Sequence, residues 1–383
     1  MSSKIWLSSL FLSIFLIGCD SPIIPTEQIE EMGIITARGT DLTDDKSIDA
    51  TLVIFQFDVQ SDSITKLLSG EGKTIKGAEE NANLESPFKL TSGKVQIELY
   101  GKEAAEEGLL RYLDPLQRDA AVSNTMYLAI GNPTAKEILL LNKGSVTMNM
   151  GQFLYEVIDS SSSEHMLPRI TLQDFLRNFY DVGIDNMLPV FETAENENPR
   201  IEKVALFNAD QYVGDLTVQD NTFINLINTT VKDQLLGFTI PLAPFKEHLA
   251  PSEYQENTDH VHGSIRILKG KTKSKLINKD KLTFKSDVTV EARLQEQSSQ
   301  IVFDDLEIMK KLETEIEKNM VEHLEDVLQT TQKYAADPFG YGKLYRTQQK
   351  DGKLTNEEWR EKYPEIKVDF NVHLKIIRHG ATE

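Results

Sequence analysis

Cysteine is the scarcest residue of this sequence, with Cys19 the only one among 383 residues. A chain with one thiol cannot hold an internal disulfide framework, and it cannot form a zinc site that needs two or more thiolates. Tryptophan is almost as rare, since only Trp6 and Trp359 are present. Because only one cysteine is present, its position in the sequence is the next question.

Positive charge is also in deficit, with 41 Lys and Arg against 60 Asp and Glu and a formal net charge of −19. Binding to nucleic acid of any sequence depends on Lys and Arg that neutralise phosphates, so nucleic acid is not expected as a partner. The mean hydropathy of −0.33 excludes a protein with many membrane spans. At roughly 100–200 residues per domain, the length predicts two or three domains, each with its own core.

The N-terminus has the pattern of a secretory signal peptide. Lys4 precedes an apolar stretch at residues 5–17, and Gly18 then leads into Cys19. The stretch is shorter than the ~20 residues that a stable membrane span needs. Residues 16–19, Leu-Ile-Gly-Cys, resemble a bacterial lipobox, which predicts removal of residues 1–18 and modification of Cys19 by S-diacylglycerol and an N-acyl chain. The alternative is a buried cysteine after an ordinary signal peptide.

Two acyl chains give lasting attachment to a membrane, whereas one chain is marginal. The acidic body that follows is expected to be held away from an anionic membrane surface. The predicted protein is therefore tethered to a membrane and not embedded in it.

Residues 19–195 are expected to form an N-terminal α/β domain. A strand around Ile34-Ile35 and another at residues 51–59 predict an antiparallel hairpin. The remaining pattern predicts a helix within 64–84, a half-buried strand at 95–99, a helix at 103–113, a strand at 126–130, and helices at 151–161 and 172–179.

Residues 192–200, which carry Asn196, Asn198 and Pro199, are the best candidate for a linker between domains. Strand patterns after it predict a small middle β-rich domain at residues 200–255. The alternating segments 261–268 and 281–294 belong to a C-terminal domain at residues 258–383.

The clearest predicted helix covers residues 304–334, where apolar residues fall three or four apart and form one stripe. Some 30 residues at 1.5 Å each give about 45 Å, enough to cover the face of a sheet. Core packing on that sheet is favoured over the alternative of a coiled-coil seam. The expected fold class is α+β, or mixed α/β, with three serial domains whose mixed or antiparallel sheets are covered by helices.

Motifs for catalysis or cofactor binding are missing. Residues 70–74, Gly-Glu-Gly-Lys-Thr, end like a phosphate-binding loop, but Leu67 stands where the first glycine is required. His260 and His262 share one face of a predicted strand, yet no third metal ligand is evident nearby. We therefore expect no enzymatic activity, no catalytic residue, no cofactor and no metal site.

Several segments, taken in order, resemble the C-subunit lipoproteins of bacterial spore nutrient germinant receptors, the Ger(x)C family. The resemblance starts after the lipobox and extends over nearly the whole chain. It is carried by residues 28–41, which end in Gly39-Thr40-Asp41, and by residues 70–78, 94–109, 114–119, 127–129, 135–139, 336–342, Trp359 and 366–380. Two residues depart from the family pattern, Asp20 after the lipid cysteine and Lys343 after Gly342.

The resemblance implies a non-enzymatic subunit, lipid-anchored on the outer face of the inner spore membrane. Its partners would be a membrane-embedded A-type subunit and a multi-pass B-type subunit that recognises the nutrient. No small-molecule ligand is predicted for this subunit itself. The alternative function is that of a solute-binding lipoprotein of a small-molecule transporter, which would need two similar α/β lobes with a cleft between them.

Overall fold

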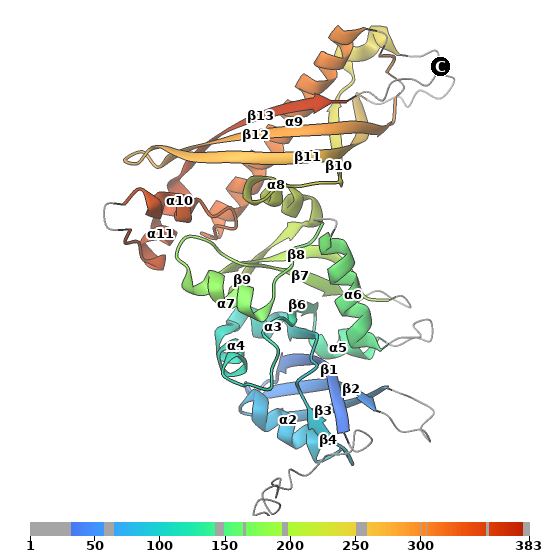
Figure 1. Ribbon diagram of the computed structural model, residues 1–383, viewed down its shortest axis with the longest axis vertical. Helices are drawn as coiled ribbons and strands as arrows, with labels where there is room; N and C mark the ends of the chain where they lie inside the picture. The colour runs from blue at the N-terminus through green and yellow to red at the C-terminus, as the bar shows by residue number, and fades with distance from the viewer. Residues whose placement is uncertain are drawn as a thin grey trace, which may run out of the picture.

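The structure is a computed structural model that describes residues 32–56, 65–141, 149–163, 166–193, 198–249, 259–299, 301–303, 305–349 and 352–377. The predicted signal peptide and Cys19 lie outside the described residues. Two β-sheets follow one another along the long axis of an elongated molecule, with the larger sheet at the N-terminal end (Figure 1). Among the described helices, none is both long and apolar enough to cross a membrane.

The first sheet is mixed, with the strand order β3-β2-β1-β5-β6-β7-β8-β9 and with β4 paired to β1. Neighbouring strands β1, β5, β6 and β7 are parallel, and so is the short β4–β1 pair. The remaining pairs, β1–β2, β2–β3, β7–β8 and β8–β9, are antiparallel. The bounds are β1 (Met32–Leu42), β2 (Ile48–Gln56), β3 (Thr65–Gly72), β4 (Lys89–Thr91), β5 (Ile97–Gly101), β6 (Tyr127–Asn132), β7 (Met187–Glu192), β8 (Arg200–Asn208) and β9 (Gln211–Thr217).

Helices cover both faces of this sheet, as its parallel centre requires. Apolar side chains of α2 (Ile75–Asn83), α3 (Lys102–Glu107), α4 (Leu110–Gln117) and α7 (Leu172–Tyr180) pack in one core cluster with the sheet. Those of α5 (Ala135–Leu140) and α6 (Met150–Ser163) pack in a second cluster. The N-terminal half of the protein is therefore a three-layer α/β/α sandwich.

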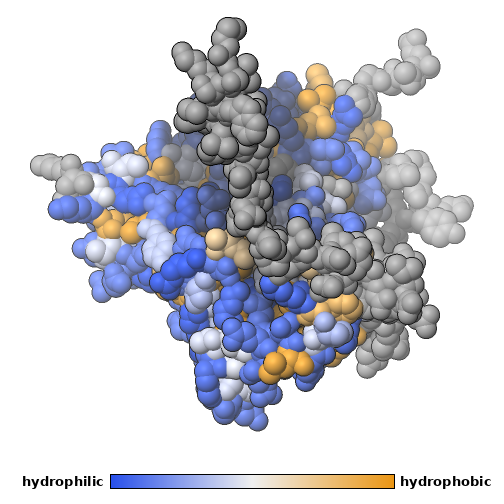
Figure 2. All heavy atoms as spheres, turned by 60° about the horizontal axis from the view of Figure 1, so that its bottom comes forward, coloured by the Kyte–Doolittle hydropathy of each residue, from blue (hydrophilic) through white to orange (hydrophobic). Residues whose placement is uncertain are grey.

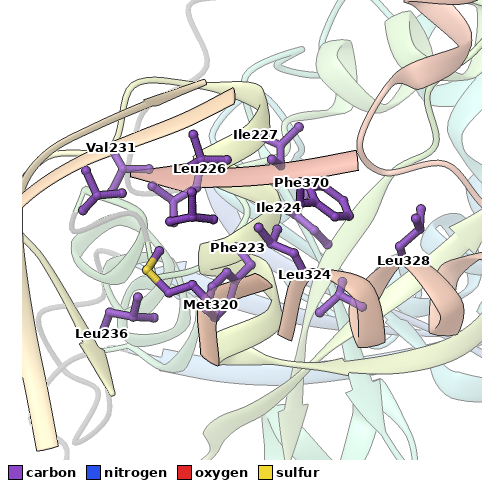
Figure 3. Packing of buried hydrophobic residues seen from close by; sticks show 14 of the residues in the cluster. Phe223, Ile224, Leu226, Ile227, Val231, Leu236, Met320, Leu324, Leu328 and Phe370 are labelled. Carbon is purple, nitrogen blue, oxygen red and sulfur yellow. The ribbon is translucent and has the colours of Figure 1, made fainter. Parts of the chain in front are cut away.

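The second sheet has the order β10-β11-β12-β13, in which only the β12–β13 pair is parallel. The bounds are β10 (Gln234–Pro241), β11 (His260–Asn278), β12 (Thr283–Gln297) and β13 (Lys367–Ile376), with helices α8 (Val218–Asn228), α9 (Leu306–Lys333), α10 (Tyr341–Thr347) and α11 (Asn356–Lys362) and two 3-10 turns, η2 (Ala243–His248) and η3 (Tyr363–Glu365). Apolar residues of α8, α9 and this sheet share one core, in which Phe223, Met320 and Phe370 lie close together (Figure 3).

Helix α9 also protects both edges of the second sheet. The Glu317 and Glu313 carboxylates accept hydrogen bonds from the backbone N–H of Leu374 and Ile376 on β13, each at 2.7 Å. At the other edge, Asn319 Oδ1 accepts a hydrogen bond from the Thr239 N–H of β10 at 3.3 Å. Backbone groups that could pair with another strand are thus occupied by helix side chains.

The expected fold class is confirmed: the protein is α+β, with mixed sheets covered by helices and the long helix packed on the C-terminal sheet. The hairpin expected near the N-terminus is β1–β2. The apolar stripe of α9 faces the sheet core, as expected, and does not form a coiled-coil seam.

The helix expected within 64–84 is wrong in its first half, which forms strand β3. Gly70 and Gly72 let α2 pack directly on that strand, since a Cβ at Gly70 would lie 2.3 Å from the Ala82 nitrogen. The helix expected at 103–113 is broken at Gly108, whose φ of 116° interrupts it between α3 and α4.

One further expectation is wrong. Strand β5 is fully buried and not half-buried, because it lies inside the sheet with helices on both faces. Glu192 ends β7 and Arg200 begins β8, its antiparallel neighbour in the same sheet, so the role of residues 192–200 as a linker between domains stays a prediction.

The strands expected in a middle β-rich domain do not form a sheet of their own. Strands β8 and β9 extend the first sheet, whereas β10 belongs to the second. The division of the chain into three domains stays a prediction, but the two sheets do not follow it. They also differ in size and strand order, unlike the two similar lobes that a solute-binding protein would need.

Candidate functional site

Residues that carry the family resemblance gather at three places in the fold. The first is a buried ion cluster around Arg38 of β1. Its Nε donates to both Glu98 oxygens at 2.8 and 2.9 Å, and its Nη1 donates to Glu79 Oε1 at 2.8 Å. Thr40 and Ser92 donate further hydrogen bonds to these two carboxylates. The cluster joins β1, β5 and α2.

Arg38 is completely buried. Burial alone would favour its neutral form, but the negative charges of Glu98 and Glu79 outweigh that cost and hold the pKa of Arg38 above its ordinary value. Arg38 Nη2 has no hydrogen-bond partner among the described residues. Both carboxylates bind the Arg38 guanidinium, and Glu79 also accepts from Lys76 at 3.2 Å. The cluster therefore holds the sheet and helix together and offers no free acid or base.

The second place is the N-terminus of α5, where the Gly39-Thr40-Asp41 motif ends. Asp41 accepts hydrogen bonds from the backbone N–H of Ala135 and Lys136, both at 2.8 Å. A carboxylate suits the positive end of a helix, so Asp41 fixes α5 onto β1. Gly39 allows this close approach, since a Cβ there would lie 3.0 Å from the Ala135 side chain.

The third place is the loop 336–342, which follows α9 and meets the first sheet. Asp337 is fully buried and accepts hydrogen bonds from the N–H groups of Gly340 and Gly342 at 2.8 Å and from Trp359 Nε1 at 3.0 Å. Burial raises the pKa of Asp337 to about 7, although these donors act in the opposite direction. Asp185, just before β7, accepts a hydrogen bond from the Asp337 N–H at 2.7 Å.

Arg360 extends this junction from α11. Its guanidinium lies 3.5 Å from Asp185 and also donates to Asn208 at the end of β8. Asn208 in turn donates to the carbonyls of Tyr334 and Ala335, at 3.0 and 3.3 Å. The end of α9 is thereby attached to the edge region of the first sheet.

Lys343, which departs from the expected family pattern, has a defined contact here. Its Nζ lies 3.0 Å from Asp181, and Arg346 reaches the same carboxylate at 2.7 Å. Gly183 and Gly342 pack backbone to backbone beside this pair, because a Cβ at Gly183 would lie 2.3 Å from the Gly342 carbonyl carbon. All three places therefore act as determinants of the fold.

Hollows between the described residues lie at or below the lower end of the usual size of a ligand pocket and are lined mainly by polar residues. One of about 190 Å³ lies beside Glu79, Lys76 and Ser92, and another of about 320 Å³ lies beside His262, Glu296 and Ser298. Ligand pockets usually enclose about 300–1,000 Å³ behind mainly apolar walls. Within the described ranges, His260 and His262 belong to no group of three or more possible metal ligands.

The predicted site residue, Cys19, lies outside the described residues, so its lipidation stays a prediction. Sequence reasoning missed two features. The partners of Arg38 lie 41 and 60 residues away, and no sequence signal points to them. A row of exposed lysines on β11 was also missed, although the alternation in Lys271-Thr-Lys273-Ser-Lys275 is visible in the sequence.

Comparison with known proteins gives consistent matches along the whole chain. Residues 25–193 match the family described as spore germination protein N-terminal domain. Residues 202–380 match the family described as spore germination B3/GerAC like, C-terminal. The spore germination protein GerQC of Bacillus cereus is 24% identical over 381 residues, covering 99% of this chain and all of that protein. The crystal structure of the GerBC protein superposes with a TM-score of 0.52 at 15% identity, covering 89% of this chain and 97% of that one.

Proposed function

The chain belongs to the GerAC-like family of spore germination proteins, and we propose that it is the lipid-anchored C subunit of a nutrient germinant receptor. The observation that carries this proposal is the extent of the match. Two family domains account for residues 25–193 and 202–380, and the relative GerQC aligns over its full length. Such a match extends over both family domains and is not confined to a single shared module.

The proposed anchor is Cys19. The lipobox-like residues 16–19 and the short apolar stretch before them support cleavage after Gly18 and acylation of the new N-terminus. Twelve residues lie between Cys19 and Met32, where β1 begins. A chain of that length spans at most about 45 Å when fully extended, which keeps the folded body close to the membrane.

The proposed mode of action is contact with the membrane-embedded A-type and B-type subunits of the same receptor. Attachment to one membrane raises the local concentration of the partners, so even a weak contact can be largely occupied. The subunit would support assembly of the receptor and permit its response to the nutrient. The proposal assigns it no catalytic residue.

The test is germination of spores that carry a Cys19→Ala substitution or a deletion of the gene. Both strains should respond poorly to the nutrient of this receptor and normally to nutrients of other receptors. Mass spectrometry of the wild-type protein should find a diacylated, N-acylated Cys19. Normal germination on its own nutrient by the deletion strain would refute the proposed function. Normal germination by the Cys19→Ala strain alone would refute only the role of the anchor.

A further inference from the structure

The second sheet has one buried face and one open face. Along β12, Phe284, Ser286 and Val288 are buried, and the residues between them point to the other side. Helices α8 and α9 pack on the buried side, and α8 also contacts β8 and β9 of the first sheet. The open face is therefore the one that neither of these helices covers.

This open face is positively charged in a negatively charged protein. We define it as the outward residues of β11, β12 and β13 beyond the β-bulge at 267–269, namely Lys269, Lys271, Lys273, Lys275, Lys285, Asp287, Thr289, Glu291, Lys367, Asp369, Asn371, His373 and Lys375. Seven lysines and three acids give the face a formal charge of +4, whereas the whole chain carries −19. The space-filling view of the opposite end of the molecule shows mostly hydrophilic surface with scattered apolar patches (Figure 2).

Three lysines on β11 line one side of this face. Lys271, Lys273 and Lys275 are all exposed, and no described carboxylate makes an ion pair with any of them. The nearest cross-strand acid, Asp287, is occupied by Lys285 at 3.1 Å and by the Asn371 amide at 3.0 Å. These two partners hold the pKa of Asp287 below its ordinary value, so it stays ionised and bound.

The register adds a repulsive pair to this row. Lys275 lies directly opposite Lys285 in the β11–β12 ladder. Like charges at directly opposed positions destabilise a sheet, and the pair of Lys285 with Asp287 offsets this repulsion only in part. A negatively charged occupant would remove the repulsion.

We propose that the open face of the second sheet is a docking surface for an extended acidic segment of a protein partner. Side chains on one face of a strand repeat every two residues, about 6.6–6.8 Å. An extended segment with acids at alternate positions has the same repeat, so its carboxylates would match Lys271, Lys273 and Lys275 one by one. Lysine ammonium groups suit such contacts as mobile point charges.

The charge of the rest of the chain favours a protein over the membrane as the occupant. The whole chain carries −19, so placing the open face against anionic lipid would also bring acidic surface toward the bilayer, which is unfavourable.

The experiment measures binding of the full-length chain in detergent micelles to a fluorescent peptide with five Glu-Ser repeats, by anisotropy. The substitutions Lys271→Gln, Lys273→Gln and Lys275→Gln are combined in one variant. The matched control combines Lys94→Gln, Lys232→Gln and Lys310→Gln, three exposed lysines elsewhere on the surface. The face variant should bind about tenfold more weakly and with a shallower salt dependence, whereas the control should change less than about twofold.

Two further measurements separate the outcomes. A peptide with the same composition in blocks of five Glu and five Ser should bind more weakly than the alternating one. Vesicles of phosphatidylglycerol should bind the wild type and the face variant equally. The proposal would be overturned if the control variant lost as much peptide affinity as the face variant. Equal affinity of the wild type for both peptides would overturn it too. So would a face variant that lost vesicle binding and kept its peptide binding. Because these are binding measurements, their failure leaves the germination test of the proposed function unaffected.

Discussion

Asp185 and Asp337 lie 152 residues apart in the sequence and are joined by two hydrogen bonds. The Asp337 N–H donates to the Asp185 carboxylate at 2.7 Å, and the Asp185 N–H donates to the Asp337 carbonyl at 2.9 Å. One residue precedes β7 of the first sheet, and the other follows α9 of the C-terminal part. This reciprocal pair connects the two halves of the fold directly, and it leads to a prediction about pH.

Stability should depend on pH through Asp337. Its pKa of about 7 in the folded protein exceeds the ordinary value of 3.8, so the folded state holds an extra proton between these values. Protonated Asp337 therefore stabilises the folded state at low pH. This stabilisation decreases as the pH rises toward 7 and does not change further above about pH 7. Urea unfolding between about pH 5 and pH 8 measures the free energy of unfolding of the wild type and of Asp337→Asn. The wild-type value minus the variant value should fall by about 1.4 kcal/mol per pH unit up to pH 7. A difference that grows with pH would show that the N–H donors of Gly340, Gly342 and Trp359 outweigh burial.

Arg38→Met should destabilise the protein strongly. The substitution leaves Glu98 and Glu79 buried without their cation, which typically costs about 3–5 kcal/mol. Urea unfolding measures the loss, and adding Glu98→Gln should recover part of it, since one buried charge is then removed. The control Lys73→Met breaks an exposed pair with Asp45 and should cost less than about 1 kcal/mol. Equal effects of the two single substitutions would contradict the structural role of the buried cluster.

Gly70→Ala should separate α2 from β3. The added Cβ would lie 2.3 Å from the Ala82 nitrogen and 2.4 Å from the Ala78 carbonyl oxygen, both of which belong to the helix backbone. Such overpacking costs about 1–3 kcal/mol, measurable as a lower midpoint of urea unfolding. Gly237→Ala is the control, because the nearest atom to its Cβ would be 4.0 Å away, and it should leave stability unchanged or raise it by up to about 1 kcal/mol. A neutral Gly70→Ala would mean that the helix moves freely on the strand.

Combined Glu313→Ala and Glu317→Ala should make the protein associate with itself. The substitutions free the Leu374 and Ile376 N–H groups on the edge of β13. Open strand edges pair readily with other chains, so light scattering should report larger species at equal concentration. The exposed residues Glu322 and Glu325 on the same helix supply the control when both are replaced by alanine. Association of the control to the same degree would point to the loss of negative charge instead of the open edge.

The sequence predicts helices and strands well where the apolar residues keep one regular spacing. The apolar stripe of α9 and the alternation along β11 and β12 identify these elements, because each has a single buried face. Strand β5 misleads for a definite reason. Its alternation of Val95, Ile97 and Leu99 with polar residues suggests an open face, yet Glu98 is buried against Arg38.

What the sequence does not reveal is which strands become neighbours. A helix was expected to begin near residue 64, but residues 65–72 form strand β3. Their glycines and charged residues hide the strand pattern of the segment that packs under α2. The pairing of Asp185 with Asp337, and of Arg38 with Glu79 and Glu98, depends on the order of strands in the first sheet. Contacts over such separations come from tertiary packing, which local periodicity does not encode.

Strand β13 has a consequence for how the protein is made. It ends at Ile376, lies parallel to β12, and is bound along its outer edge by α9. The C-terminal core cannot close until β13 has been synthesised, whereas the first sheet already has all its strands by Thr217. Premature termination upstream of β13 should yield a product with a complete N-terminal half and an open, sticky C-terminal half, which quality-control proteases would be expected to remove.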